Sequence, residues 1–188
     1  MKKNFLTLVS FMFLLNMTLM AQNPTLETIH QRKSVRSFTD QPVSVENLTT
    51  IVKAGMAAPT GMNRQPWEFL VIQDREAMAK LSENLPYAKM LKDAQAAIIV
   101  VGNPEKSPYW YLDCSAATQN ILLAAESLGL GAVWTLAYPS EERMNIITTA
   151  LSIPLPYKPL CLIPIGYPKG PQTPKNKWVE AKMHLNKW

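Results

Sequence analysis

The sequence contains few of the residues from which hydrolytic and metal sites are most often built. Its only histidines are His30 and His184, which lie near the two ends of the 188-residue chain. Its only cysteines, Cys114 and Cys161, have neither CxxC spacing nor a neighbouring histidine. Catalytic triads and structural zinc sites both need such residues in defined groups. The composition therefore argues against a histidine-based hydrolase and a multi-histidine metal site, and we expect no metal.

The two cysteines leave two interpretations open. In an oxidising compartment, Cys114 and Cys161 can form one disulfide. Alternatively, both are small buried hydrophobic residues. The apolar segments around them, "YLDCSAA" and "KPLCLIPIG", favour the second interpretation.

Positive charge is modest and unevenly placed. The formal net charge is +5, and without Lys2 and Lys3 the chain keeps 17 basic against 14 acidic residues, or about +3. This excess is too small to predict nucleic-acid binding. The basic residues gather towards the two ends of the remaining chain, at Arg32, Lys33, Arg36, Lys169, Lys175, Lys177, Lys182 and Lys187. The first group, "RKSVRSF" (residues 32–38), is either a solvated turn or a binding site for an anion.

The first 21 residues have the three parts of a secretory signal peptide. Lys2 and Lys3 form a charged start, residues 5–20 form an apolar core, and Ala21 is a small residue before the cleavage point. A retained membrane anchor is the alternative, but the apolar stretch is short and contains Asn16. We therefore predict cleavage of residues 1–21, export to a bacterial periplasm and no stable membrane anchor.

Residues 22–188 predict a single domain of mixed helices and strands. The chain is 47% hydrophobic and 18% charged, which suits a globular domain with a substantial core. Helices are predicted over residues 25–34, 45–58, 75–83, 109–131 and 139–151, with Ser44 and Asp74 as N-caps. Strands are predicted over residues 67–74, 96–102, 132–135 and 158–168. Helices and strands do not alternate strictly, so the predicted class is α+β, with a small, mainly antiparallel sheet surrounded by helices.

The predicted helix at residues 109–131 is apolar on more than one side. A helix that is apolar nearly all round is usually buried on all sides. A domain of this size has difficulty burying such a helix alone, and we infer that a second subunit covers one face. A central helix within one chain is the alternative.

Residues 57–69, "AAPTGMNRQPWEF", predict a polar loop. Gly61 would let the backbone approach a ligand closely, and Thr60, Asn63 and Gln65 carry hydrogen-bond donors and acceptors. A turn closed by side-chain hydrogen bonds would use some of the same residues. The segment is longer and more polar than a turn requires, which favours a binding loop.

Four motifs in order make the chain resemble the FMN-dependent nitroreductases, over almost all of residues 22–188. The first is the Arg-x-Ser-x-Arg pattern at residues 32–36, and the second is "APTGMNRQPWEF" at residues 58–69. The third is "QNILLAAESLGLGAVWT" at residues 119–135, and the fourth is "PIGYP" at residues 164–168, followed by a basic tail. The resemblance implies an intertwined homodimer that binds FMN.

By this resemblance, the first basic cluster holds the FMN phosphate and ribityl chain. A phosphate dianion favours several charge-assisted donors, and arginine can bind it through two N–H groups at once. The residues implied are Arg32, Lys33, Ser34 and Arg36, with Lys175 and Lys177 from the tail. For the two tail lysines, a solvated tail is the alternative.

The resemblance also places two segments against the flavin ring. The first belongs to the partner chain and contains Pro59, Thr60, Gly61, Met62, Asn63 and Gln65, of which Gln65 could instead only brace the loop. The second contains Val133, Trp134 and Thr135, and plain core packing is the alternative for Trp134. Relatives often carry a glycine after the Trp-Thr pair, where this chain has Leu136 and Ala137.

The activity that the resemblance implies is hydride transfer by a ping-pong mechanism. NADH or NADPH reduces the flavin and leaves, and a nitroaromatic, a quinone or a similar conjugated acceptor takes its place. The cofactor carries the chemistry, so no catalytic side chain is assigned. Two other functions stay open. One is a non-catalytic protein that stores or senses FMN, and the other is a related flavin enzyme such as a reductive dehalogenase.

Export conflicts with this electron donor, because NAD(P)H is scarce outside the cytoplasm. A reducing partner protein or a small reduced carrier is the alternative donor. We predict that the native protein begins at Gln22. N-terminal mass analysis of protein from fractionated cells tests this prediction, and an intact Met1 on cytoplasmic protein would contradict it.

Overall fold

The computed structural model describes residues 23–188. The predicted signal peptide, residues 1–21, and its cleavage point before Gln22 lie outside the described residues, so export stays a prediction. Within residues 23–188, no helix is long and apolar enough to cross a membrane.

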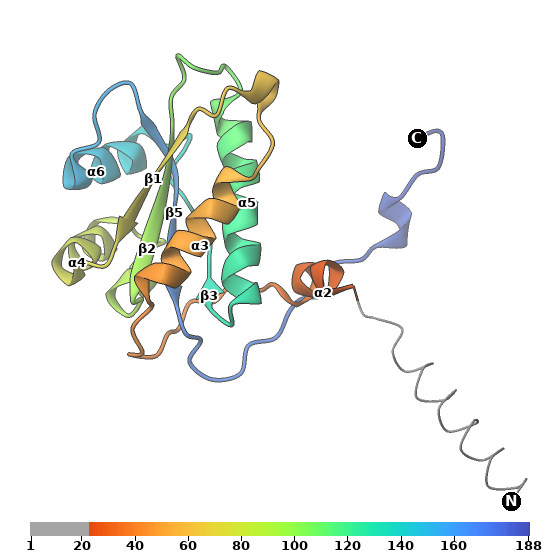
Figure 1. The fold of residues 1–188 in the computed structure, drawn as a ribbon, viewed down its shortest axis with the longest axis horizontal. Helices are drawn as coiled ribbons and strands as arrows, with labels where there is room; N and C mark the ends of the chain where they lie inside the picture. Colours follow the sequence, from red (N-terminus) through yellow and green to blue (C-terminus); the bar gives the residue numbers. More distant parts are fainter. Residues whose placement is uncertain (1–22) are drawn as a thin grey trace, which may run out of the picture.

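A five-stranded sheet forms the centre of the domain (Figure 1). Its three long strands lie side by side in the order β1 (Trp67–Ile72), β2 (Ala96–Gly102) and β5 (Lys158–Gly166). Two short strands, β3 (Gly131–Ala132) and β4 (Thr135–Leu136), pair with the other edge of β5. Every pairing between these strands is antiparallel, which confirms the predicted α+β class and sheet.

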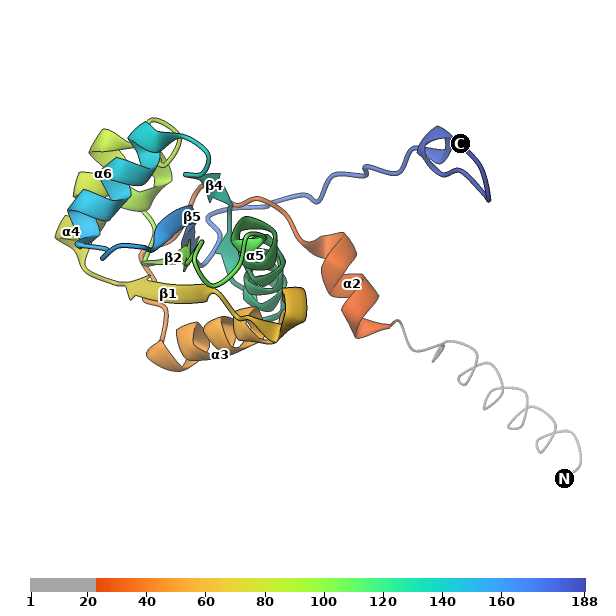
Figure 2. The same ribbon diagram turned by 90° about the horizontal axis from the view of Figure 1, so that it is seen from above.

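Helices cover both faces of the sheet, so that the domain has three layers (Figure 2). α3 (Val45–Met56) and α5 (Trp110–Ser127) pack on one face. α4 (Arg75–Asn84) and α6 (Glu141–Leu151) pack on the other. This arrangement gives the domain two hydrophobic cores, one on each side of the sheet.

Strand β2 separates the two cores. Its side chains point alternately to opposite faces, as in any strand. Ile98 and Val100 pack with α3 and α5, whereas Ile99 and Val101 pack with α4 and α6. Every residue of β2 is buried, which explains why this stretch of the sequence is apolar without alternation.

Local signals fix where two of the helices begin. Ser44 caps α3 by accepting a hydrogen bond from the Asn47 N–H at 3.1 Å. Asp74 caps α4 by accepting one from the Ala77 N–H at 2.7 Å. Both predicted N-caps are confirmed, because a side-chain oxygen satisfies an N–H that has no partner within the helix.

The long helix ends earlier than predicted, at Ser127 instead of residue 131. Gly129 adopts a left-handed conformation (φ +72°), and the Leu130 N–H donates to the Ala125 carbonyl at 2.9 Å. This pattern closes the last turn of a helix and favours glycine at the left-handed position.

The strand predicted at residues 132–135 is divided into β3 and β4. Gly131 and Ala132 pair with Gly166 and Ile165, and pairing resumes only at Thr135. The residue that would oppose Val133 in this register is Pro164, which has no N–H to donate. The prediction of one continuous strand was therefore wrong at its centre.

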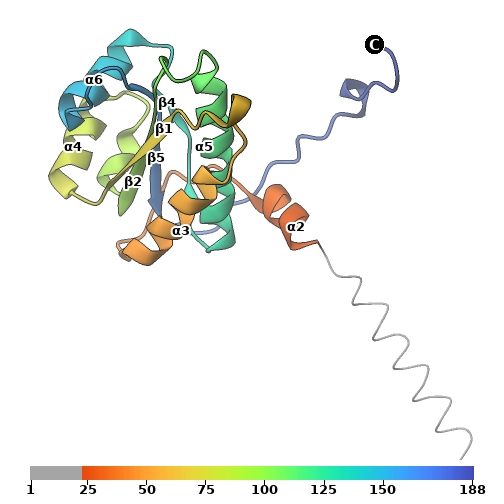
Figure 3. The ribbon, with the colours of Figure 1, turned by 45° about the horizontal axis from the view of Figure 1, so that its top comes forward.

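The basic cluster lies in an extended segment rather than in a helix. α2 (Pro24–Gln31) ends before it, three residues short of the predicted end. The segment then bridges to the sheet, where Ser34 pairs with Ala132 and Phe38 pairs with Pro168. Beyond this bridge the tail leaves the body of the domain, on the same side as α2 (Figure 3).

Helix α5 is buried on its inner side only. Ala117 and Ile121 belong to the core, but Leu112 and Gln119 are exposed on the opposite side, with Leu123 half-buried. The alternative of a helix surrounded by its own chain is therefore wrong.

The interpretation of the two cysteines as small buried residues is confirmed. Both thiols are free, and neither side chain is exposed. Burial raises the pKa of Cys161 to about 12, and burial also raises the pKa of Cys114. The thiols therefore stay protonated at neutral pH and are poor nucleophiles.

The close approach of the basic segment to β3 generates a prediction at Gly131. A Cβ atom at this position would lie 2.6 Å from the Cβ of Val35, which is fully buried. Gly131→Ala must therefore displace residues 32–36, and we expect the free energy of unfolding to fall by about 1–3 kcal/mol. Urea denaturation measures this change.

Gly129→Ala is the matched control, because a Cβ atom there would meet no atom within 4 Å. Its cost comes only from the left-handed backbone and should be about 1 kcal/mol. Equal stability of wild-type protein and the Gly131→Ala variant would contradict the close approach of Gly131 to Val35.

Candidate flavin site

One pocket collects the basic residues from both ends of the chain. Its volume is about 800 Å³, and it is lined by the end of α2, the extended segment and residues 172–178 of the tail. Six predicted site residues line it together: Arg32, Lys33, Ser34, Arg36, Lys175 and Lys177. Among residues 23–188, no aspartate or glutamate lines this pocket, so its electrostatic field favours an anion.

Lys33 differs from the other cations because its ammonium group is paired. Its Nζ atom lies 2.6 Å from Oε1 of Glu126, near the end of α5, and both side chains are largely buried. In contrast, no carboxylate of the described residues lies within ion-pair distance of Arg32 or Arg36. Lys33 thus ties the basic segment to α5, and the two arginines supply the free charge.

The predicted segment 133–135 lies beside the basic cluster in the same chain. The Val35 N–H donates to the Ala132 carbonyl at 3.0 Å, which aligns the two segments. The Thr135 hydroxyl donates a hydrogen bond to the Leu162 carbonyl at 2.6 Å, so this hydroxyl is not free to donate one to a ligand.

Trp134 has a polar atom without a partner. Its indole Nε1 is buried and makes no hydrogen bond to any residue of the described part of the chain, although the ring packs against the α3–α5 core. A buried N–H without an acceptor is costly. Core packing therefore accounts for the ring of Trp134, whereas its N–H has no partner within the described part of the chain.

The loop at residues 59–65 has an unusual backbone. Its Gly61–Asn63 portion forms the short helix η1, and three of its non-glycine residues have left-handed φ values: Met62 (53°), Asn63 (55°) and Gln65 (45°). Such conformations cost about 1–3 kcal/mol each and persist where the surroundings enforce them, commonly at binding sites. This strain supports the interpretation as a binding loop over that of an ordinary turn.

Hydrogen bonds within the loop hold part of this shape. The Thr60 hydroxyl accepts from the Gln65 N–H at 3.2 Å, and Gln65 Nε2 donates to Asn63 Oδ1 at 2.9 Å. Gln65 therefore braces the loop, which was one of its two predicted roles.

A buried carboxylate anchors the loop to the body of the domain. Asp113, in the first turn of α5, is only 6% exposed. Its Oδ1 accepts a hydrogen bond from the Gly61 N–H at 2.9 Å, and its Oδ2 accepts one from the Ser107 hydroxyl at 3.0 Å. Sequence analysis missed both Asp113 and Ser107. The signal available was an acidic residue inside the apolar stretch "YLDCSAA".

The loop and the basic pocket lie at opposite ends of α5. Gly61 is bonded to Asp113 at the start of the helix, whereas Lys33 is bonded to Glu126 near its end. Thirteen residues of helix separate these two contacts, or about 20 Å at the helical rise per residue. One chain therefore does not bring together all of the predicted site residues.

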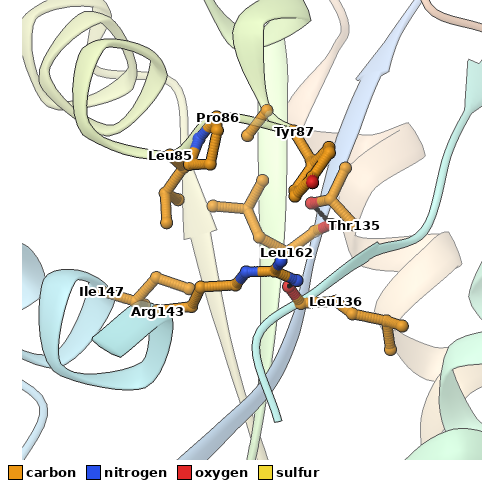
Figure 4. A pocket seen from close by; sticks show the side chains of 9 residues that line it. Leu85, Pro86, Tyr87, Thr135, Leu136, Arg143, Ile147 and Leu162 are labelled. Carbon is orange, nitrogen blue, oxygen red and sulfur yellow. Dashed lines mark hydrogen bonds between the residues drawn. The ribbon is translucent and has the colours of Figure 1, made fainter. Parts of the chain in front are cut away.

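A second, smaller pocket lies on the other side of the sheet, between α4, α6 and β4 (Figure 4). Arg143 crosses it, with its guanidinium carbon 4.7 Å from the centre of the Tyr87 ring. The cavity has a volume of about 10 Å³, which is room for one water molecule. It contains only Thr135 of the predicted site residues.

Residues 23–188 contain no group of histidine, cysteine, aspartate or glutamate side chains that could hold a metal ion. The charged and polar groups described above suit an organic anion better than a metal.

Comparison with known proteins places the chain in one family. The model of the Nitroreductase family matches residues 29–85 and 80–167. A crystal structure from Parabacteroides distasonis, named "Putative NADH dehydrogenase/NAD(P)H nitroreductase", is 50% identical, with a TM-score of 0.87 over 89% of this chain and 100% of that one. An Archaeoglobus fulgidus protein of the same name is 41% identical over 87% of this chain and 98% of its own length.

A third relative was solved with a ligand. The structure of a "putative nitroreductase in complex with FMN" from Desulfovibrio desulfuricans is 33% identical, with a TM-score of 0.76 over 89% of this chain and 98% of that one. The four motifs noted in the sequence lie within the matched part of the chain, apart from Pro168 and the basic tail. The chain therefore belongs to the nitroreductase family.

Proposed function

We propose that this protein is an FMN-dependent oxidoreductase that transfers hydride from NAD(P)H to nitroaromatics, quinones or similar conjugated acceptors. The observation that carries the proposal is the basic pocket, which has free arginines, no acidic lining residue among residues 23–188 and, at Ser34, a bridge to Ala132, the residue before the 133–135 segment. The volume of about 800 Å³ is in the range of cofactor pockets.

The lining residues fit the phosphate of FMN. Arg32 and Arg36 have no carboxylate partner within the described residues, and Ser34 adds a hydroxyl donor between them. Charge-assisted bonds from planar guanidinium groups are the strongest contacts that a side chain makes with phosphate. Lys175 and Lys177 add positive charge from the tail. Lys33 already pairs with Glu126, so its proposed role is to hold the segment in place.

We propose that two chains build each flavin site, as a homodimer. The 59–65 loop lies about 20 Å along α5 from the basic pocket of its own chain, so the loop facing a given pocket comes from the partner. Apolar surface that one chain leaves uncovered supports this assembly. Leu112 is exposed on α5, α2 has no buried residue, and Trp178 and Trp188 are exposed on the tail.

When bound, FMN supplies the hydride chemistry itself. The residues of the chain would bind and orient it: the arginines would hold the phosphate, and residues 133–135 would lie along the flavin ring. Leu136, which follows this segment, is exposed and could contact a bound acceptor from β4. If export occurs as predicted, a reducing protein or small reduced carrier replaces NAD(P)H as the donor.

The test is FMN binding by wild-type protein and by two variants. Wild-type protein is expected to bind FMN and to lose its yellow absorbance when NADH or NADPH is added without oxygen. Arg32→Ala and Arg36→Ala each remove a charge-assisted phosphate contact, which should weaken FMN binding about tenfold or more. Quenching of flavin fluorescence measures the affinity.

Lys80→Ala is the control. It removes a cation from the exposed surface of α4, where Lys80 pairs with Glu76 at 2.7 Å, and should leave FMN affinity unchanged. Wild-type affinity in both Arg32→Ala and Arg36→Ala would mean that the basic cluster is ordinary surface charge. FMN-bound protein that stays yellow with both nucleotides would point to storage of FMN or to another donor.

A further inference from the structure

We propose that Asp113 is a positioning residue whose carboxylate holds the strained 59–65 loop in the shape that meets the flavin. The inference rests on the proposed function, because it takes this loop to be a flavin contact. Asp113 does not touch the basic pocket, and it acts only through the loop.

Each carboxylate oxygen has one defined partner. Oδ1 accepts from the Gly61 N–H at 2.9 Å, and Oδ2 accepts from the Ser107 hydroxyl at 3.0 Å. Ser107, which is fully buried, accepts in turn from the Tyr109 N–H at 3.2 Å. Asp113 therefore joins the loop to the segment that leads into α5.

No cation of the described residues pairs with Asp113, although the residue is almost completely buried. Burying a carboxylate with only neutral partners is unfavourable, and its position in the first turn of a helix offsets only part of that cost. A hydrogen bond to an anion is also stronger than one between neutral groups. The carboxylate thus suits a position that must hold an N–H group firmly.

The loop has few other connections to the body. Asn63, Arg64 and Gln65 bond through their N–H groups to Thr60 or Gly61, which are themselves loop residues. The remaining side-chain contact, from Arg64 Nη1 to the Lys106 carbonyl, is long at 3.3 Å and exposed. Gly61 is therefore where the strained part of the loop is anchored.

This anchor is placed where it can act on the left-handed residues. Gly61 directly precedes Met62 and Asn63, the first two residues with left-handed φ values. Without the hydrogen bond to Asp113, these residues can relax towards more favourable backbone conformations. The loop would then lose the fixed shape that a flavin ring needs.

The experiment compares four variants of the full-length protein by FMN titration, by hydrogen exchange at residues 60–65 and by thermal unfolding. Asp113→Ala removes both acceptors, and we expect FMN binding to weaken about tenfold, with faster exchange in the loop. Asp113→Asn keeps an acceptor for Gly61 and should recover most of the affinity. Ser107→Ala removes one partner of the carboxylate and should have an intermediate effect.

Ser82→Ala is the control. Ser82 is also a buried serine, 4% exposed, whose hydroxyl donates one hydrogen bond, to the Lys89 carbonyl at 3.0 Å, but it lies on α4. This variant should lose thermal stability without a change in FMN affinity or loop exchange. A purely structural Asp113 would behave in the same way.

The order of the variants in loop exchange and in FMN affinity tests the proposal. It is supported if loop exchange and FMN affinity change together in the order wild type, Asp113→Asn, Asp113→Ala. It is overturned if Asp113→Ala folds and keeps wild-type exchange at residues 60–65, or if its loop exchange rises without a loss of FMN affinity. If Asp113→Ala is unfolded, wild-type exchange in Ser107→Ala overturns it. Wild-type protein that binds no FMN would instead refute the proposed function, and loop exchange would still report whether Asp113 anchors the loop.

Discussion

Helix α5 fixes the distance between the two groups of candidate site residues, the basic pocket and the 59–65 loop, and the arrangement of the proposed site depends on that distance. Asp113 binds the 59–65 loop at the start of the helix, and Glu126 binds Lys33 of the basic segment near its end. The helix between them is rigid because its inner face is buried against the sheet and α3. The two groups are therefore held about 20 Å apart. On the proposed function, a flavin that contacts both groups binds where two chains meet.

Much of the fold could be predicted from the sequence because its signals are local. The caps at Ser44 and Asp74 mark helix starts within a few residues, and the apolar run of β2 identifies a central strand. The division of the strand at Val133 could not be predicted, because it depends on Pro164 in a strand that is distant in sequence. Register of this kind is known only once the pairing is known.

Likewise, only part of the candidate site could be predicted from the sequence. Its charged residues and its polar loop stand out in the sequence, since clusters of arginine and of turn-forming residues are visible without a structure. The contacts that organise them are not visible. Lys33 resembles its neighbours in the sequence but pairs with a residue 93 positions away, and Asp113 bonds to a residue 52 positions away. Sequence analysis therefore named candidate binding residues but not the residues that position them.

The central claim is that each flavin site is shared between two chains, and mixing two defective variants tests it most directly. One variant, Arg32→Ala with Arg36→Ala, lacks the basic pocket, and the other, Thr60→Ala with Asn63→Ala, has an altered loop. Each alone should bind FMN poorly. If the chains are co-expressed and pair at random, half of the dimers contain one intact shared site, and FMN binding should recover to about a quarter of the wild-type sites. Binding no greater than that of the separate variants would contradict the shared site.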